Sequence, residues 1–174
     1  VEVSTKPSKD SVAYAVIGGR SNARWWLIPL ETKQTVISGL ALFQPTLPSA
    51  KLIKLAAVVL TRLRFFKLWA KPKIYIKGTP YIKKYFEGSN LSFAYFTGTD
   101  SPHRKVTVQV MNLTGVLKGF AKLSRNPLIY PLLQHEAEVL TQVALLNLTH
   151  ATVPKVLFFG EVNDITLLVT DTRK

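Results

Sequence analysis

The fold is decided by residues 106–123, which read VTVQVMNLTGVLKGFAKL. Apolar and polar side chains alternate along 106–111 and again along 116–123, which is typical of strands with one buried face. Residues 112–115 lie between them and include Asn112 and Gly115, which favour turns. The stretch therefore predicts two antiparallel strands joined by a short turn.

The flanking residues extend this pattern in both directions. Residues 91–96 alternate as well, and the turn-forming residues 98–102 connect them to the first of the two strands. Downstream, Pro131 precedes the apolar-rich run 132–148 and suits the first turn of a helix, where its missing N–H would be unpaired anyway. Three strands and a helix are therefore predicted.

A second hairpin follows the predicted helix. Residues 156–159 and 165–169 are apolar, and the turn-forming residues 160–164 separate them. The predicted order over residues 91–174 is therefore β-β-β-α-β-β.

This order resembles the small lobe of protein-kinase-like enzymes, and several short segments resemble aminoglycoside phosphotransferases and related small-molecule kinases. GFAKL at 119–123 resembles the strand with the nucleotide lysine, and HEAEVL at 135–140 resembles the helix with its glutamate partner. VPKVL at 153–157 resembles the start of the fourth strand, and LLVT at 167–170 the fifth strand entering the hinge. The resemblance implies an α+β fold in which a five-stranded antiparallel sheet and one helix form the lobe.

Lys122 is the candidate cation for this chemistry. Phosphoryl transfer requires a fixed cation on the nucleotide phosphates and an anion that holds it in place. On the predicted helix, Glu136 falls inside the apolar arc and Glu138 outside it, at about 100° per residue. A carboxylate that faces a core needs a partner, so Glu136 is preferred and Glu138 is the alternative.

The resemblance also implies further nucleotide contacts. The loop 97–102 would cover the phosphates with its backbone and with Gly98, Thr99 and Ser101, although a plain hairpin turn explains the same residues. The backbone at Thr170 and Thr172 would bind adenine. The cofactors implied are ATP and Mg²⁺, with a hydroxyl of a sugar or aminoglycoside as the acceptor.

No catalytic residue is expected in this chain, because the family's catalytic aspartate and metal ligands lie beyond the position of Lys174. The chain would then be the nucleotide-binding part of a phosphotransferase, inactive alone and truncated at the hinge. A lobe retained as a binding module without chemistry is the other explanation.

Residues 1–90 form a separate predicted region. Runs 13–17 and 25–29 flank the turn-forming residues 18–22, which predicts a hairpin, and 35–43 suits a third strand. Residues 50–69 contain no glycine or proline and follow Ser49, an N-cap residue, so a helix is predicted over 49–70. A domain boundary is placed near residue 90.

The positive charge is concentrated in this first region. The chain has a net charge of +13, and residues 51–84 contain basic side chains but no acidic one. The candidate contacts with an anionic surface are Lys51, Lys54, Arg62, Arg64, Lys67, Lys71 and Lys73. A solvated helix, a membrane surface and a nucleic acid each remain possible explanations. The alternative function is therefore a non-catalytic basic adaptor.

The composition excludes several classes of site. The absence of cysteine excludes disulfides, thiolate metal sites and a cysteine nucleophile. His103, His135 and His150 lack the spacing of metal ligands. The apolar run 55–60 is far shorter than the roughly 20 residues that cross a bilayer. No transmembrane segment is expected, and a cytoplasmic location is predicted, peripheral to a membrane if the basic region binds lipid.

Overall fold

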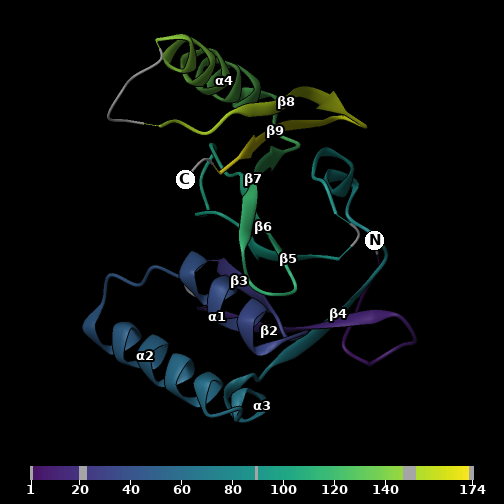
Figure 1. Cartoon of the computed structure of the whole chain (residues 1–174), viewed down its shortest axis with the longest axis vertical. Helices are drawn as coiled ribbons and strands as arrows, with labels where there is room; N and C mark the ends of the chain where they lie inside the picture. Colours follow the sequence, from purple (N-terminus) through teal and green to yellow (C-terminus); the bar gives the residue numbers. More distant parts are fainter. Residues whose placement is uncertain (1, 20–22, 89, 147–151, 173–174) are drawn as a thin grey trace.

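The computed structural model describes residues 2–19, 23–88, 90–146 and 152–172. Within these residues nine strands form one antiparallel sheet in the order β1-β4-β2-β3-β5-β6-β7-β9-β8 (Figure 1). The strands are β1 (Glu2–Ser4), β2 (Ser11–Gly19), β3 (Arg24–Pro29), β4 (Lys73–Lys77), β5 (Leu91–Phe96), β6 (Val106–Asn112), β7 (Leu117–Ser124), β8 (Val156–Val162) and β9 (Ile165–Asp171). The helices are α1 (Lys33–Leu42), α2 (Pro48–Arg62), α3 (Phe66–Trp69) and α4 (Tyr130–Leu145), with 3₁₀ turns η1 (Tyr81–Tyr85) and η2 (Pro127–Ile129).

The predicted fold class is wrong. The strands of residues 91–174 do not form a five-stranded sheet with one helix, because β5 continues the sheet by pairing with β3. In this pairing Trp26 lies opposite Phe96, and Leu27 lies opposite Tyr95. The rings of Trp26 and Phe96 stack with their centroids 4.7 Å apart. The molecule is a mostly β structure whose single sheet crosses the boundary predicted near residue 90.

The predicted hairpin of the first region is present as β2 and β3, which pair from Tyr14 opposite Pro29 to Gly19 opposite Arg24. The centre of its turn, residues 20–22, lies outside the described residues. The third strand predicted at 35–43 is wrong, because these residues belong mainly to helix α1. Thr32 and Thr35 form a reciprocal capping box there. It provides partners for backbone N–H groups at the start of a helix, so it favours a helix over a strand.

The run predicted to be helical over 49–70 contains two helices, α2 and α3. Between them Arg64 adopts a left-handed conformation with φ of 66°, which ends α2. Thr61 then joins the two helices, because its hydroxyl donates to the Ala57 carbonyl at 2.7 Å and accepts from the Trp69 indole at 3.1 Å. The chain folds back on itself after α2.

The segments predicted downstream are close to those observed. Strands β5, β6 and β7 form a meander, and β9 and β8 extend it. Asn163 and Asp164 make the tight turn of the last hairpin with φ of 49° and 61°, as two-residue hairpin turns require. Helix α4 ends at Leu145, and residues 147–151 of the predicted helix and its connection lie outside the described residues.

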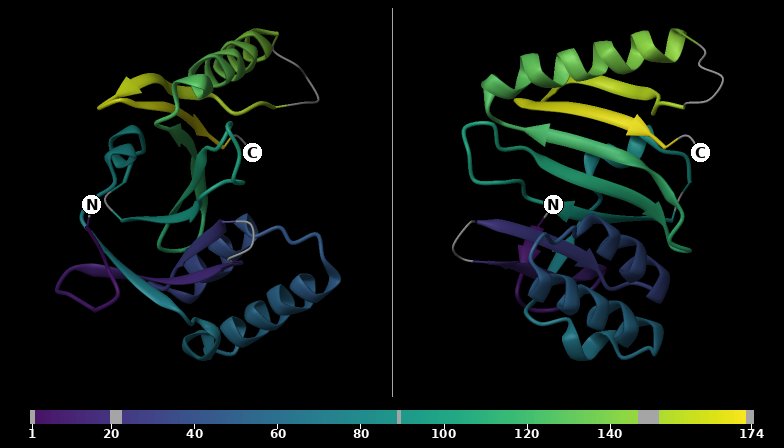
Figure 2. Two further views of the ribbon diagram at one scale, coloured as in Figure 1. Left: turned by 180° about the vertical axis from the view of Figure 1, so that it is seen from behind. Right: turned by 90° about the vertical axis from the view of Figure 1, so that its left-hand side faces the viewer.

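Helices α1 and α4 cover the same face of the sheet at different positions along it (Figure 2). The Gln109 amide of β6 donates to the Ser38 carbonyl of α1 at 2.9 Å. Leu168 of β9 packs on the same face against Leu133 and Ala137 of α4. Ile82 of η1 packs on the opposite face, in the core that β5, β6, β7 and β9 share. Both faces of the sheet therefore contribute side chains to packed clusters.

Candidate functional site

Lys122 lies on β7 and points toward the face that α4 covers. Its neighbours Ala121 and Leu123 point the other way, into the core shared with Ile82, because successive side chains of a strand alternate between faces. Lys122 lies opposite Thr107 of β6 and Leu168 of β9. Strand periodicity therefore presents this ammonium group to the helix.

Glu136 of α4 meets Lys122 above the sheet. Leu133 and Ala137 bury one side of the helix against Leu168, and Glu136 lies beside that buried side. The Lys122 ammonium donates to Oε1 of Glu136, and both side chains are 31% exposed. Glu138 instead accepts a hydrogen bond from Gln134 at 2.9 Å in an exposed position. Of the two glutamates considered from the sequence, Glu136 is the one that pairs with Lys122.

The ion pair lines a cavity of about 210 Å³ between the sheet and α4. Apart from Lys122 and Glu136, the lining side chains are apolar or carry a hydroxyl group: Thr107, Phe120, Leu140, Pro154, Leu168 and Thr170. A charged pair in such surroundings is screened less than one in open solvent. The cavity therefore offers one cation, held by one anion, with threonine hydroxyls nearby.

This donor set suits a phosphate group better than a metal ion. The ammonium of Lys122 can donate to a phosphate oxygen while Glu136 fixes its position. No cluster of three or more His, Asp or Glu side chains able to hold a metal ion occurs in the part of the chain that the structure describes. An ammonium group donates hydrogen bonds and has no lone pair to offer a metal ion, so Lys122 is a candidate contact for a phosphate oxygen.

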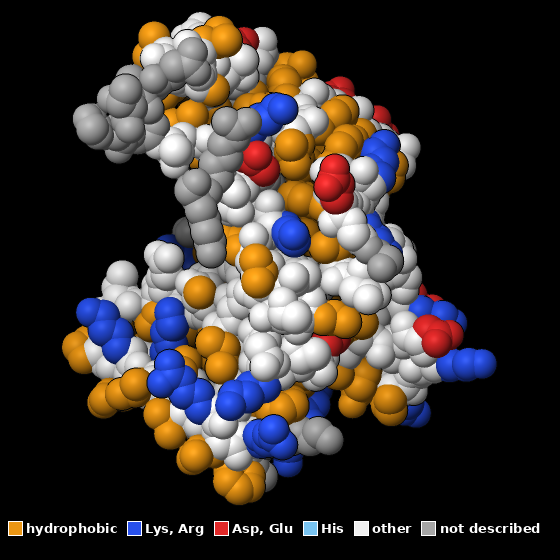
Figure 3. Space-filling model, in the orientation of Figure 1, with side chains coloured by type: hydrophobic (Ala, Val, Ile, Leu, Met, Phe, Trp, Pro, Cys, Tyr) orange, Lys and Arg blue, Asp and Glu red, His pale blue; other side chains and the backbone are white. Residues whose placement is uncertain are grey.

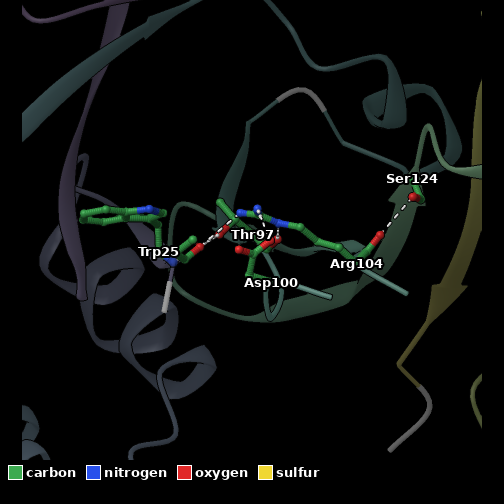
Figure 4. A network of polar contacts seen from close by, with 6 residues as sticks. Trp25, Thr97, Asp100, Arg104 and Ser124 are labelled. Atoms are coloured by element: carbon green, nitrogen blue, oxygen red, sulfur yellow. Dashed lines mark hydrogen bonds and ion pairs between the residues drawn. The ribbon is translucent and has the colours of Figure 1, made fainter. Parts of the chain in front are cut away.

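The loop predicted to cover the phosphates is tied to neighbouring strands (Figure 4). The Trp25 N–H of β3 donates to the Thr97 hydroxyl at 3.1 Å, and the Thr97 N–H donates to the Trp25 carbonyl at 2.9 Å. The guanidinium of Arg104 donates to the carbonyls of Thr97 at 2.9 Å and Ala23 at 3.1 Å. These bonds hold both ends of the loop against β3.

Arg104 also connects the loop to the end of β7. The hydroxyl of Ser124 donates to the Arg104 carbonyl at 2.9 Å, and Asp100 lies 3.6 Å from the guanidinium as an exposed ion pair. Gly98 has φ of 78°, and a Cβ there would lie 2.3 Å from the Lys105 carbonyl oxygen. This glycine is therefore required by the narrow loop, whatever else the loop does.

The structure brings together only some of the predicted site residues. Thr170 lines the cavity with Lys122 and Glu136, whereas Gly98, Thr99, Ser101 and Thr172 are not among its lining residues. Thr99 and Ser101 are exposed on the loop. The Thr172 N–H, expected to meet adenine, donates to the Lys118 carbonyl at 3.3 Å.

The sequence reasoning missed five lining residues: Thr107, Phe120, Leu140, Pro154 and Leu168. Phe120 and Lys122 are two residues apart on one strand, so strand alternation alone would have placed Phe120 on this face. Thr107 needs the register between β6 and β7, which alternation does not provide. Only part of the cavity was therefore accessible from the sequence.

A second polar cluster lies away from this cavity, beside β2 and β5. Tyr14 and Tyr95 face each other with ring centroids 5.8 Å apart, and the Ser92 hydroxyl donates to the Glu31 carboxylate. Burial raises the pKa of Tyr14, and it raises the pKa of Tyr95 to about 12. Burial also raises the pKa of Glu31, and the hydrogen bond from Ser92 partly opposes that shift. Tyr14, Tyr95 and Glu31 line a cavity of about 370 Å³.

In comparisons with known proteins, no family model, no curated protein and no solved structure matched the chain. The resemblance to aminoglycoside phosphotransferases stays a prediction that rests on the quoted segments.

Proposed function

We propose that this chain contributes the phosphate-holding part of the nucleotide site of an ATP-dependent phosphotransferase. The acceptor would be a hydroxyl group of a small molecule such as a sugar or aminoglycoside. Lys122 would bind the nucleotide phosphates, and Glu136 would hold Lys122 in position. The observation that carries the proposal is the ion pair between these two side chains inside a lined cavity.

The physical argument concerns the freedom of the lysine. A lysine side chain loses up to about 2 kcal/mol of conformational free energy when it is fixed by a ligand. The pair with Glu136 has already restricted Lys122 in the free protein. A phosphate that enters the cavity would therefore meet an oriented cation, which is what phosphoryl transfer requires.

The remainder of the nucleotide has two candidate neighbours. Thr170 lines the cavity and is itself one of the two residues predicted to bind adenine through the backbone. Thr107 lines both this cavity and a neighbouring one of about 470 Å³ that contains Trp26 and Phe43. Mg²⁺ would accompany the triphosphate and neutralise part of its charge.

The experiment that tests the proposal is binding of a non-hydrolysable ATP analogue with Mg²⁺ to the full chain. Lys122→Met removes the cation, and Glu136→Gln removes its anchor without changing the shape of the side chain. Each variant is expected to weaken binding about tenfold or more, as expected for a lost charge-assisted contact. Isothermal titration at low and moderate salt measures the effect.

Two matched controls are present in the same elements. Lys118→Met removes an exposed lysine of β7, and Glu138→Gln removes an exposed glutamate of α4. Both are expected to leave the dissociation constant within about twofold of the original value. Equal loss of binding in all four variants, or no loss in any, contradicts the proposal.

We also propose that basic side chains within residues 51–84 contact an anionic surface. The support is the absence of any acidic residue in this segment, together with the exposed positions of Lys51, Arg62, Arg64 and Lys71. Among the described residues, none of the helices has the length and apolar character needed to span a bilayer. On the basis of the exposed positive charge, we propose a cytoplasmic chain that contacts a membrane from one side.

A further inference from the structure

Helix α2 exposes large apolar side chains to solvent. Leu52, Leu55 and Val59 are 67%, 59% and 45% exposed, and Leu63, which directly follows the helix, is 59% exposed. A surface helix of a globular protein normally turns such residues toward the core and its polar residues outward. This arrangement is reversed in α2, so its outward side is suited to a contact rather than to water.

The four side chains form one continuous stripe. Advancing about 100° per residue from Leu52, the positions of Leu55, Val59 and Leu63 all fall within about 60° of it. Ala57 and Thr61, which are buried, lie on the opposite side of the helix, where it packs on α1 and α3. The stripe is therefore the side of α2 that no other described element covers.

Basic residues accompany the stripe. Lys51 and Arg62 are exposed and lie on the same flank of the helix near its two ends, about 80–100° around the axis from Leu52. We call these two residues with Leu52, Leu55, Val59 and Leu63 the α2 outer face. Figure 3 shows hydrophobic and basic side chains gathered over the part of the molecule where α2 lies. Residues 51–84 contain no acidic side chain to neutralise this charge.

We infer that the α2 outer face binds the surface of an anionic lipid membrane. The helix would lie parallel to the bilayer with its leucines between the headgroups and the acyl chains. Lys51 and Arg62 would meet the anionic headgroups. The inference extends the anionic contact proposed above and does not depend on nucleotide binding.

The chemistry of the stripe favours lipid over other anionic partners. Proteins bind single-stranded nucleic acid with basic side chains and with aromatic rings that stack on bases. The centre of the α2 outer face consists of aliphatic side chains, which neither stack on bases nor bind phosphate. A bilayer interface combines an apolar layer with anionic charge, and so matches both parts of this face.

The experiment is co-sedimentation of the full chain with vesicles. One vesicle type contains phosphatidylcholine alone, and the other contains about one quarter phosphatidylserine. The double variant Leu55→Ser and Val59→Ser should lower the fraction bound to the anionic vesicles about tenfold or more. The variant Lys51→Gln and Arg62→Gln should remove most of the preference for anionic over neutral vesicles.

The controls carry single changes of the same kind at exposed positions elsewhere. Leu145→Ser changes an exposed leucine at the end of α4, and Lys77→Gln changes an exposed lysine at the end of β4. Both should bind vesicles within about twofold of the unmodified chain. Lys122→Met should also retain vesicle binding, which separates this inference from the nucleotide proposal. Circular dichroism on every variant establishes that the fold is retained.

Three outcomes overturn the inference. The first is that the chain does not sediment with anionic vesicles at low salt. The second is that binding persists in the Leu55→Ser and Val59→Ser variant and is lost only with added salt, while an oligonucleotide competes for it. The third is that this variant abolishes self-association of the chain and leaves vesicle binding unchanged.

Discussion

Lys122 of β7 donates a hydrogen bond to Glu136 of α4, so one ion pair joins the sheet to the helix that covers it. The two residues are 14 positions apart in the sequence. Their elements are also joined by the apolar contacts of Leu133, Ala137 and Leu168. The pair therefore adds a polar contact to the apolar contacts between α4 and the sheet, and it lines the cavity.

The first prediction concerns the strength of this pair. In a double-mutant cycle of Lys122→Met and Glu136→Gln, we expect a coupling free energy of about 1 kcal/mol, because both side chains are only partly exposed to screening water. Urea denaturation of the two single variants and the double variant measures it. Strictly additive effects would contradict a stabilising pair.

The pair of Arg104 and Asp100 provides the comparison for this cycle. Its charged atoms lie 3.6 Å apart and the Asp100 side chain is 70% exposed. Asp100→Asn is expected to change the free energy of unfolding by less than about 0.5 kcal/mol.

The second prediction concerns Arg104 itself. Its guanidinium donates to the carbonyls of Thr97 and Ala23, and lysine cannot reproduce two such directed bonds. Arg104→Lys should therefore lower the free energy of unfolding by about 1–3 kcal/mol. Hydrogen exchange of the Thr97 amide, which bonds to Trp25 across β3 and β5, should accelerate in the variant. An unchanged exchange rate would show that the loop stays in place without Arg104.

The third prediction concerns the close approach of β7 and β9 at Gly119. A Cβ at this position would lie 2.2 Å from the Thr170 carbonyl oxygen and 2.5 Å from the Phe86 ring. Gly119→Ala should therefore destabilise the fold by about 1–3 kcal/mol, as overpacking does. Thermal unfolding followed by circular dichroism measures the change.

Gly39→Ala is the matched substitution for Gly119→Ala. The three atoms nearest to its new Cβ outside the helix backbone belong to side chains, the closest being Ile28 Cγ2 at 3.1 Å. Alanine also favours the helix by about 1 kcal/mol over glycine. A smaller loss of stability than in Gly119→Ala is expected, and an equal or larger loss would contradict this argument.

The fourth prediction is a loss of stability at alkaline pH. The pKa of Tyr95 is raised from 10.0 to about 12 and that of Tyr14 is also raised, mainly by burial. Above pH 10 the unfolded chain loses these protons while the folded chain keeps them, so the free energy of unfolding falls as pH rises. Each tyrosine contributes a slope of about 1.4 kcal/mol per pH unit to this fall. The contribution of Tyr95 stops growing near pH 12, because the folded chain also loses the Tyr95 proton there.

Tyr14→Phe and Tyr95→Phe test this slope. Each variant lacks one of the two protons, so its free energy of unfolding should fall less steeply above roughly pH 10 than that of the unmodified chain. Urea midpoints at several alkaline pH values give the comparison. Slopes that match the unmodified chain in both variants would mean that these tyrosines do not cause the loss.

The downstream elements were predictable because each is marked locally. Strands β5, β6 and β7 alternate clearly, and Gly115 and Asn163 lie in the turns that end β6 and β8. Glu136 was separable from Glu138 because helical periodicity placed one near the apolar side and the other in solvent. In each case the decisive signal is confined to a few neighbouring residues.

The fold class was not predictable, because it depends on pairing between distant strands. Alternation along β5 predicts a strand but does not say what pairs with its second edge, and the residues of β3 that pair there are 68 and 70 positions away along the chain. For the same reason the sequence did not predict that Thr107 lies beside Lys122, because this contact depends on the register of β6 and β7.

Helix α1 was misassigned for a local reason. Thr35, Val36 and Ile37 are β-branched and favour a strand. The capping box of Thr32 and Thr35 and the burial of Val36 and Leu40, one helical turn apart, favour the helix instead. Burial in the tertiary structure decides between the two, and it is not visible in the residue types alone.

The pairing of β3 with β5 has a consequence for any attempt to divide this chain near residue 90. Each half would then carry a newly opened sheet edge, with Trp26 on one and Phe96 on the other. Exposed edges with unpaired backbone groups and aromatic side chains recruit strands from other molecules. Fragments cut at this point are expected to aggregate or to reassociate with each other, and a soluble piece requires a cut elsewhere.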